Sequence, residues 1–406
     1  MYFAAPACTR LRHAGASGRG PRPGYHPGGN TRHPERPLLG PADIEPFIQD
    51  AIASAQRERD YLARTGHQGP LPPINFLAVS GGGDDGAFGA GLLVGWTASG
   101  TRPEFKGVTG ISTGALIAPF AFLGPEEDAA LREVYTTIGP ADVLKPRGLL
   151  AALTNDALAD NSPLFELISR HINAEFLARI AREYQDKGRI LLIGTTNLDA
   201  RRPVIWNMGA IAVAARDNPR ALELFRKIML ASAAIPGAFP PVMIDVEVNG
   251  QPHQEMHVDG GAMAQVFLYP PRMFELIRQQ GVKVPPRERR VYIIRNSRLD
   301  PDWASVDRLT YSIAGRAISS LIQTQGIGDL YRIYLTAQQD GLDYNLAYIG
   351  ADFRAEHTED FDTAYMRALF DYGYQLGRKG YPWQKVPPGM TVAKTPESTR
   401  GHRKTN

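Results

Sequence analysis

The sequence has only one cysteine, Cys8, among its 406 residues. A single cysteine excludes an intrachain disulfide and any cysteine-rich metal site. No stretch approaches the ~18 consecutive apolar residues that a membrane-spanning helix needs. The sequence also lacks a large excess of charge of either sign, because it has 45 basic and 42 acidic residues and a formal net charge of +3. Nucleic-acid binding needs basic residues clustered on a folded face, and much of this small excess lies in the terminal tails, so we expect no nucleic-acid partner.

The composition that is present, 43% hydrophobic and 21% charged, is typical of a globular protein. The length allows one large α/β domain with extensions, or two to three ordinary domains. Residues 9 to about 40 are rich in Gly, Pro, Arg and His and lack apolar periodicity, which predicts disorder. Apolar residues at helical spacing predict a helix over Pro41–Arg64.

The segment Met1–Cys8 places small residues before a cysteine, like the end of a secretory signal. A complete signal also has a basic segment and an apolar run of roughly 7–15 residues, and neither is present here. Two interpretations stay open. Cys8 is an incidental residue of a cytoplasmic protein, or it is a lipidation site of a bacterial cell-envelope protein whose signal lies upstream of Met1.

Short apolar runs alternate with helical patterns along most of the chain. The runs are bounded by turn residues, as buried parallel strands are, and they are Asn75–Val79, Gly107–Ile111, Ile190–Thr195 and Val291–Ile294. Residues 309–334 and 363–378 have helical patterns. This alternation predicts a layered α/β fold with a largely parallel central sheet.

A candidate nucleophile lies in Gly110-Ile111-Ser112-Thr113-Gly114, between a predicted strand and a predicted helix. A serine on such a sharp turn is held in strained geometry, and the flanking glycines prevent clashes there. The N-terminus of the following helix favours developing negative charge. Because the five-residue pattern alone is also typical of a plain turn, the flanking elements carry this assignment.

The glycine-rich segment 80–86 directly follows the first predicted strand. Consecutive glycines let backbone N–H groups converge on an anion, as an acyl-transfer enzyme requires for its oxyanion. The segment also matches the dinucleotide-binding fingerprint, but Glu104, at about the expected distance, has no strand before it. Asp84 and Asp85 would repel a pyrophosphate, and no Lys-Ser/Thr pair follows the glycines, which excludes a P-loop.

A serine nucleophile needs a general base. In a histidine-triad α/β-hydrolase the histidine follows the serine and the acid late in the chain. His357, in a polar segment, is the well-placed late candidate. From the residues alone, a histidine-triad esterase therefore stays open.

Three segments together resemble the motifs of patatin-like phospholipases in order and approximate spacing: Gly81-Gly82-Gly83-x-x-Gly86, Gly110-x-Ser112-x-Gly114 and Val258-Asp259-Gly260-Gly261. The similarity spans roughly Asn75–Pro270 and includes residues 233–241. It implies a patatin-like three-layer α/β/α fold. It also implies a division into an N-terminal extension (1–72), a catalytic domain (73–272) and a C-terminal strand and helices that complete the fold before a disordered basic tail (273–406).

The resemblance implies a Ser–Asp dyad without a catalytic histidine, a metal or a cofactor. Ser112 would attack an acyl ester of a lipid, and Asp259 would take its proton. Backbone N–H groups of Gly81, Gly82 and Gly83 would bind the oxyanion. A general base works best with its pKa near the operating pH, so we expect apolar surroundings to raise the pKa of Asp259.

A lipid substrate also implies a peripheral contact with a membrane surface. A catalytically silent patatin-like scaffold is the remaining alternative, and the intact Ser112 and Asp259 argue against it. His257 lies two residues before Asp259 on the same strand face, where we expect a structural role.

One position departs from the family pattern. Asp85 stands where the family commonly carries Arg or Lys before the last glycine of the loop. An acidic residue there predicts a preference for neutral esters over anionic phospholipids. Alternatively, Asp85 points away from the site and serves only the packing of the loop.

Overall fold

The computed structural model describes residues 2–4, 41–146, 159–248, 251–300 and 305–391. The predictions made for Cys8, for residues 9–40 and for the basic tail lie outside these ranges.

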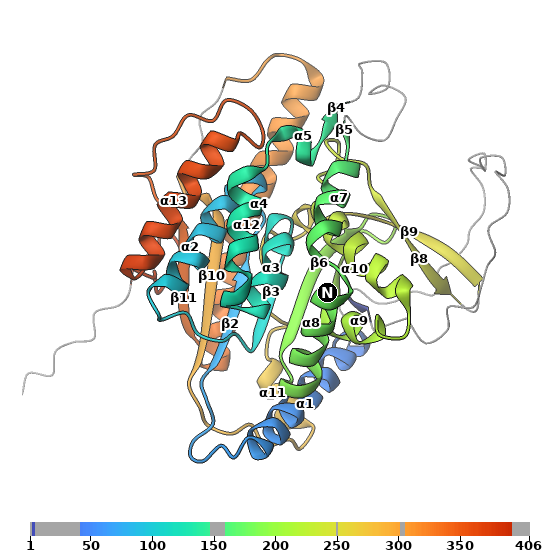
Figure 1. Ribbon diagram of the computed structural model, residues 1–406, viewed down its shortest axis with the longest axis vertical. Helices are drawn as coiled ribbons and strands as arrows, with labels where there is room; N and C mark the ends of the chain where they lie inside the picture. The colour runs from blue at the N-terminus through green and yellow to red at the C-terminus, as the bar shows by residue number, and fades with distance from the viewer. Residues whose placement is uncertain (1, 5–40, 147–158, 249–250, 301–304, 392–406) are drawn as a thin grey trace, which may run out of the picture.

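A central β-sheet organises the fold (Figure 1). Its strands lie in the order β1 (Tyr2–Ala4), β7 (Arg202–Asn207), β6 (Ile190–Asn197), β3 (Gly107–Gly110), β2 (Ile74–Val79), β10 (Arg289–Arg298) and β11 (Asp343–Ile349). The five neighbours from β6 to β11 are parallel, and β7 runs antiparallel to β6. The predicted α/β fold with a largely parallel central sheet is therefore confirmed.

A β-hairpin extends the sheet near the carboxyl end of β6. It consists of β8 (Val242–Val248) and β9 (Gln251–Asp259), and β9 pairs antiparallel with β6 so that Asp259 lies opposite Thr195. Because β6 is parallel to β3, the end of β9 comes close to the turn that follows β3.

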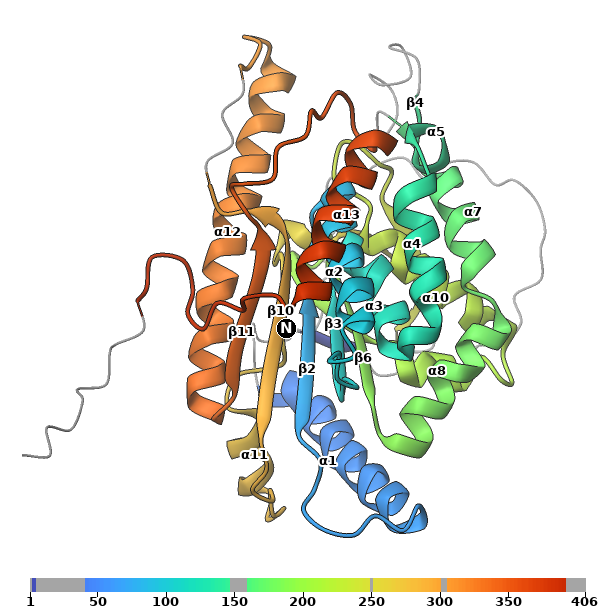
Figure 2. The ribbon, with the colours of Figure 1, turned by 60° about the vertical axis from the view of Figure 1, so that its left-hand side comes forward.

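Helices cover both faces of the sheet (Figures 1 and 2). One face carries α2 (Gly86–Ala98), α3 (Thr113–Leu123), α4 (Asp128–Thr137), α5 (Pro140–Val143), α7 (Ser162–His171), α8 (Ala174–Lys187), α9 (Met208–Ala214), α10 (Pro219–Ser232) and α13 (Thr363–Lys379). The other face carries α1 (Pro41–Arg64), α11 (Met273–Gln279) and α12 (Thr310–Asp340). Side chains of β2 alternate between the two cores, with Leu77 and Val79 facing one and Ala78 the other.

The predicted helix over Pro41–Arg64 is confirmed as α1, and it packs against the sheet rather than standing apart from it. Phe47 and Ile48 of this helix are buried in the same core as α11 and α12. No helix in the described ranges is both long and apolar enough to span a bilayer.

Helices α2 and α13 pack with their backbones in close approach. A Cβ on Gly91 of α2 would lie 2.0 Å from the carbonyl oxygen of Phe370, and a Cβ on Gly373 of α13 would lie 2.4 Å from that of Phe88. Glycine is required at both positions because any side chain would overlap the neighbouring backbone. This contact fixes α2, and with it the glycine-rich loop that precedes α2.

Candidate active site

Ser112 lies on the turn between β3 and α3 with φ of 55° and ψ of −127°. A positive φ is strained for a residue with a side chain, and it is typical of a nucleophile elbow. A Cβ on Gly114 would lie 2.3 Å from the carbonyl oxygen of Val79, and a Cβ on Gly110 would lie 2.3 Å from that of Gly114. Both glycines of the G-x-S-x-G pattern are thus required by the tight turn.

Ser232 supports this turn, although no motif in the sequence indicates it. Its Oγ accepts a hydrogen bond from the backbone N–H of Ser112 at 3.0 Å and donates to the carbonyl oxygen of Gly194 at 2.7 Å. Ser232 ends α10 and is fully buried. The strained backbone of the nucleophile is therefore tied to β6.

Asp259 ends β9 and is 5% exposed. Its carboxylate accepts a hydrogen bond from the backbone N–H of Gly261 at 2.6 Å, and the side chain of Ser112 lies beside it. Burial raises the pKa of Asp259 to about 6, although both the Ser112 side chain and the Gly261 N–H favour its ionised form. A Cβ on Gly260 would lie 2.6 Å from the carbonyl oxygen of Gly194, so the chain can turn here only with a glycine.

The glycine-rich loop requires one correction. We expected Gly81 to offer its N–H to an oxyanion, but this group already donates to the carbonyl oxygen of Gln265 at 3.0 Å. Gly82 and Gly83 follow with φ of 155° and 59°, and within the described ranges their N–H groups have no protein acceptor. Two donors therefore remain where three were expected.

Asn296, at the carboxyl end of β10, holds this loop in place. Its side-chain amide donates to the carbonyl oxygen of Ser80 at 2.9 Å and accepts from the N–H of Gly89 at 3.0 Å. A Cβ on Gly82 would lie 2.0 Å from the carbonyl oxygen of Asn296, which explains the glycine. The sequence offered one signal for Asn296, namely its place two residues after a predicted strand.

The two aspartates of the loop have separate partners. Asp85 accepts a hydrogen bond from the hydroxyl of Tyr365 on α13 at 2.6 Å, and burial raises the pKa of Asp85 to about 6. Asp84 accepts hydrogen bonds from His357 Nε2 at 2.7 Å and from the N–H of Phe361 at 2.8 Å. His357 is thus engaged with Asp84 rather than with Ser112.

The second histidine near the motifs also points elsewhere. His257 Nδ1 lies 2.9 Å from Thr195 Oγ1, its Nε2 lies 3.3 Å from Glu255, and its ring is fully buried. These contacts agree with the structural role expected for His257.

A cavity of about 40 Å³ opens beside Ser112. Its polar lining consists of Ser112 together with Asp84, Thr113 and Tyr135, and the hydroxyls of the last two lie 2.6 Å apart. The remaining wall is apolar apart from Gly83: Leu116, Val134, Ile138, Val143, Leu164, Leu167, Ala233, Ile235, Phe239, Phe361 and Met366. No lysine or arginine of the described chain lines this cavity, and Asp85 does not line it either.

No group of three or more His, Cys, Asp and Glu residues in the described ranges is arranged to hold a metal ion. The chemistry that these residues can perform is that of the serine, the carboxylate and the backbone donors.

A serine on a strand–turn–helix elbow beside a buried carboxylate, in an α/β sheet, is typical of serine hydrolases. Residues 77–270 match the family model described as "Patatin-like phospholipase". The family is one of lipid acyl hydrolases. The crystal structure of VipD from Legionella pneumophila is similar at 10% sequence identity, over 76% of this chain and 67% of that chain, with a TM-score of 0.36. No curated protein matches the chain.

Proposed function

We propose that this protein hydrolyses acyl esters of lipids, with Ser112 as the nucleophile and Asp259 as the general base. One observation carries the proposal. A serine in a strained turn lies beside a buried carboxylate whose pKa is raised to about 6. Such a carboxylate is ionised at neutral pH, yet it is basic enough to accept a proton during the reaction.

The reaction runs in two halves. Ser112 Oγ attacks the ester carbonyl carbon while its proton passes to the carboxylate of Asp259, and the carbonyl oxygen becomes an oxyanion. The Asp259 proton then goes to the leaving alcohol as the ester bond breaks, which leaves an acyl group on Ser112. In the second half, water gives its proton to Asp259 and attacks the acyl group, and the fatty acid departs as Ser112 recovers its proton.

The backbone donors for the oxyanion are the N–H groups of Gly82 and Gly83, since that of Gly81 is already used. The N-terminus of α3 adds favourable partial charge at the same place. Removing one such donor from an acyl-transfer enzyme typically costs roughly 10²–10³ in rate. The fixed positions of this loop, held by Asn296, would therefore matter for turnover.

The cavity beside Ser112 suits an acyl chain, because its walls are mostly aliphatic and aromatic. Among the described residues, Asp84 is the one charged side chain of its lining, and it would repel an anionic head group. We therefore assign the predicted preference for neutral esters to Asp84 instead of Asp85, whose carboxylate is bonded to Tyr365 on α13. A membrane surface would be the source of such substrates.

A fluorophosphonate probe tests the proposal directly, because it labels a serine only when that serine is activated. We expect labelling of the wild type and no labelling of Ser112→Ala. A panel of p-nitrophenyl esters and phospholipids would then define chain length and head group. A folded wild type that is neither labelled nor active would establish the silent scaffold instead.

A further inference from the structure

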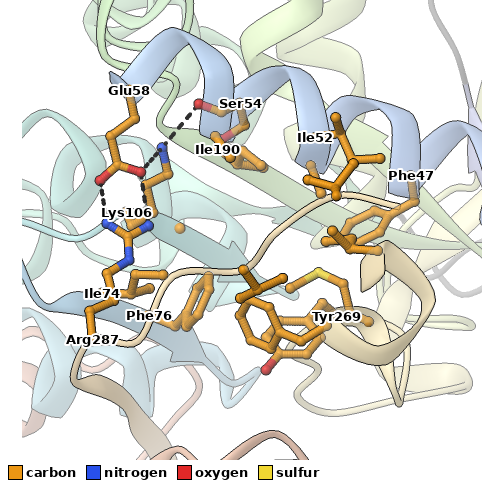
Figure 3. Close-up of a pocket in the computed structure, with 18 of the residues that line it drawn as sticks. Phe47, Ile52, Ser54, Glu58, Ile74, Phe76, Lys106, Ile190, Tyr269 and Arg287 are labelled. Atoms are coloured by element: carbon orange, nitrogen blue, oxygen red, sulfur yellow. Dashed lines mark hydrogen bonds and ion pairs between the residues drawn. The ribbon is translucent and has the colours of Figure 1, made fainter. Parts of the chain in front are cut away.

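A second cavity, of about 100 Å³, lies between α1 and the sheet (Figure 3). Its lining includes Ile74, Gly107 and Ile190, which begin β2, β3 and β6. Ser112 instead follows the carboxyl end of β3. Because these strands are parallel, the two cavities lie at opposite ends of the same strands.

The roof of this cavity comes from α1, α11 and residues 282–287, all outside the matched range 77–270. Most side chains that line it are apolar: Phe47, Ala51, Ile52, Ala55, Leu71, Ile74, Phe76, Val108, Ile190, Leu192, Leu268, Met273, Phe274, Ile277, Val282 and Val284. Such walls favour an aliphatic chain, and each methylene buried there strengthens binding roughly fourfold.

Three charged residues of the cavity, Glu58, Lys106 and Arg287, lie together at one end of it (Figure 3). Arg287 donates to both oxygens of Glu58, at 2.8 and 3.0 Å, and Lys106 Nζ lies 3.2 Å from the same carboxylate. Two cations therefore share one anion. Burial lowers the pKa of Lys106 to about 8, which reflects the cost of keeping this extra positive charge away from water.

Two further basic residues, Arg59 and Lys283, line the cavity, and Glu58 is its one acidic residue within the described chain. The cavity thus combines an apolar interior with an excess of positive charge. An anion with one aliphatic chain would satisfy both features. Two chains of a phospholipid would not fit a volume of this size.

We propose that this cavity binds a fatty acid, with its chain between α1 and the sheet and its carboxylate near Lys106, Arg287 and Lys283. A short to medium chain such as octanoate suits the volume. A fatty acid is also the acid product of the function proposed above, but binding here does not depend on that function. The site would couple the amount of free acid to the stability of α1 on the body of the protein.

The test is isothermal titration of octanoate into the full-length Ser112→Ala protein, which cannot turn over an ester by the proposed route. Octanol, with the same chain and no charge, should bind several-fold more weakly. Ala51→Phe places a ring in the cavity and should weaken octanoate binding at least about tenfold. Ala63→Phe, the same change at an exposed position of α1, should leave binding unchanged.

A charge reversal at the surface provides a second test, which does not disturb the core. Lys283 is exposed, so Lys283→Glu should keep the fold and weaken octanoate binding about fivefold while leaving octanol unaffected. Lys379→Glu, the same reversal at an exposed residue of α13 that does not line the cavity, is its control. Binding that survives Ala51→Phe and Lys283→Glu would place the ligand at the active site and overturn the proposal, as would no binding at all. Probe labelling of the wild type is measured separately, so failure here is distinct from failure of the hydrolase proposal.

Discussion

Ser232 Oγ lies 3.0 Å from the backbone nitrogen of Ser112, although the two residues are 120 positions apart in the sequence. The hydroxyl is fully buried and donates a hydrogen bond to the carbonyl oxygen of Gly194. A single side chain therefore satisfies two backbone groups beneath the strained turn.

Ser232→Ala should lower the free energy of unfolding by about 1–3 kcal/mol, because it leaves a buried N–H without an acceptor. Ester hydrolysis should fall as well, since the position of Ser112 depends on that contact. Urea denaturation and kcat/KM are the measurements. Ser320→Ala, on the exposed part of α12, is the matched control and should change stability by less than about 0.5 kcal/mol. Equal effects of the two substitutions would contradict the supporting role of Ser232.

Ser112→Ala and Asp259→Asn should each abolish ester cleavage while the protein remains folded. The double variant should be no worse than either single one, because the two residues act as one unit. His357→Ala should retain most activity, since its ring is bonded to Asp84. If His357→Ala were as inactive as Ser112→Ala, a histidine-dependent mechanism would replace the dyad.

The pH dependence of kcat/KM should show an acid limb with its midpoint near pH 6. Asp259 must be ionised to take the proton from Ser112, and burial raises the pKa of Asp259 to about 6. Activity should therefore rise with pH through this value and level off above it.

Asp85 provides the control for this assignment, because burial raises its pKa to about 6 as well. Asp85→Asn should keep the acid limb of the activity profile if Asp259 causes it. The pH dependence of stability has the opposite sign: activity rises with pH, whereas the contribution of such a group to the free energy of unfolding falls. A carboxyl group with a raised pKa in the folded state contributes stability below pH ~4, and this contribution is lost as pH rises through about 6. Asp85→Asn should thus flatten part of the stability profile while leaving the activity limb in place.

Selectivity between lipids should respond to Asp84 and not to Asp85. Asp84→Asn removes the charge of Asp84 from the lining of the acyl cavity but keeps an oxygen that can accept from Phe361. The ratio of kcat/KM for an anionic to a neutral lipid should rise about fivefold in Asp84→Asn at low salt. The ratio should stay constant in Asp85→Asn, and an increase there would restore Asp85 as the selectivity residue.

Local patterns in the sequence were sufficient to predict the parallel strands and the turn at Ser112. Strands β2, β6 and β10 each contain a run of mostly apolar residues, which is typical of parallel strands buried on both faces of a sheet. Ser112 was identifiable because its turn needs glycines at fixed offsets.

The contacts that complete the site could not be predicted in this way. Ser232 and Asn296 contact the loops around Ser112 from elements that are distant in sequence, and neither residue lies in a recognisable sequence motif. The engagement of the Gly81 N–H by Gln265 is likewise a tertiary contact, so the number of free donors was overestimated. The sequence predicted that α1 is a helix but not that it packs against the sheet, because an apolar stripe does not specify which surface it covers.

The position of β10 and β11 beyond β2 limits where this chain can be cut. A fragment ending at residue 270 would leave β2 as an unpaired edge, with a row of open N–H and C=O groups beside an apolar strand. It would also uncover the face of α2 on which Gly91 meets α13, where no side chain can shield the backbone. Such a fragment should aggregate rather than fold, even though it contains Ser112, Asp259 and every motif glycine.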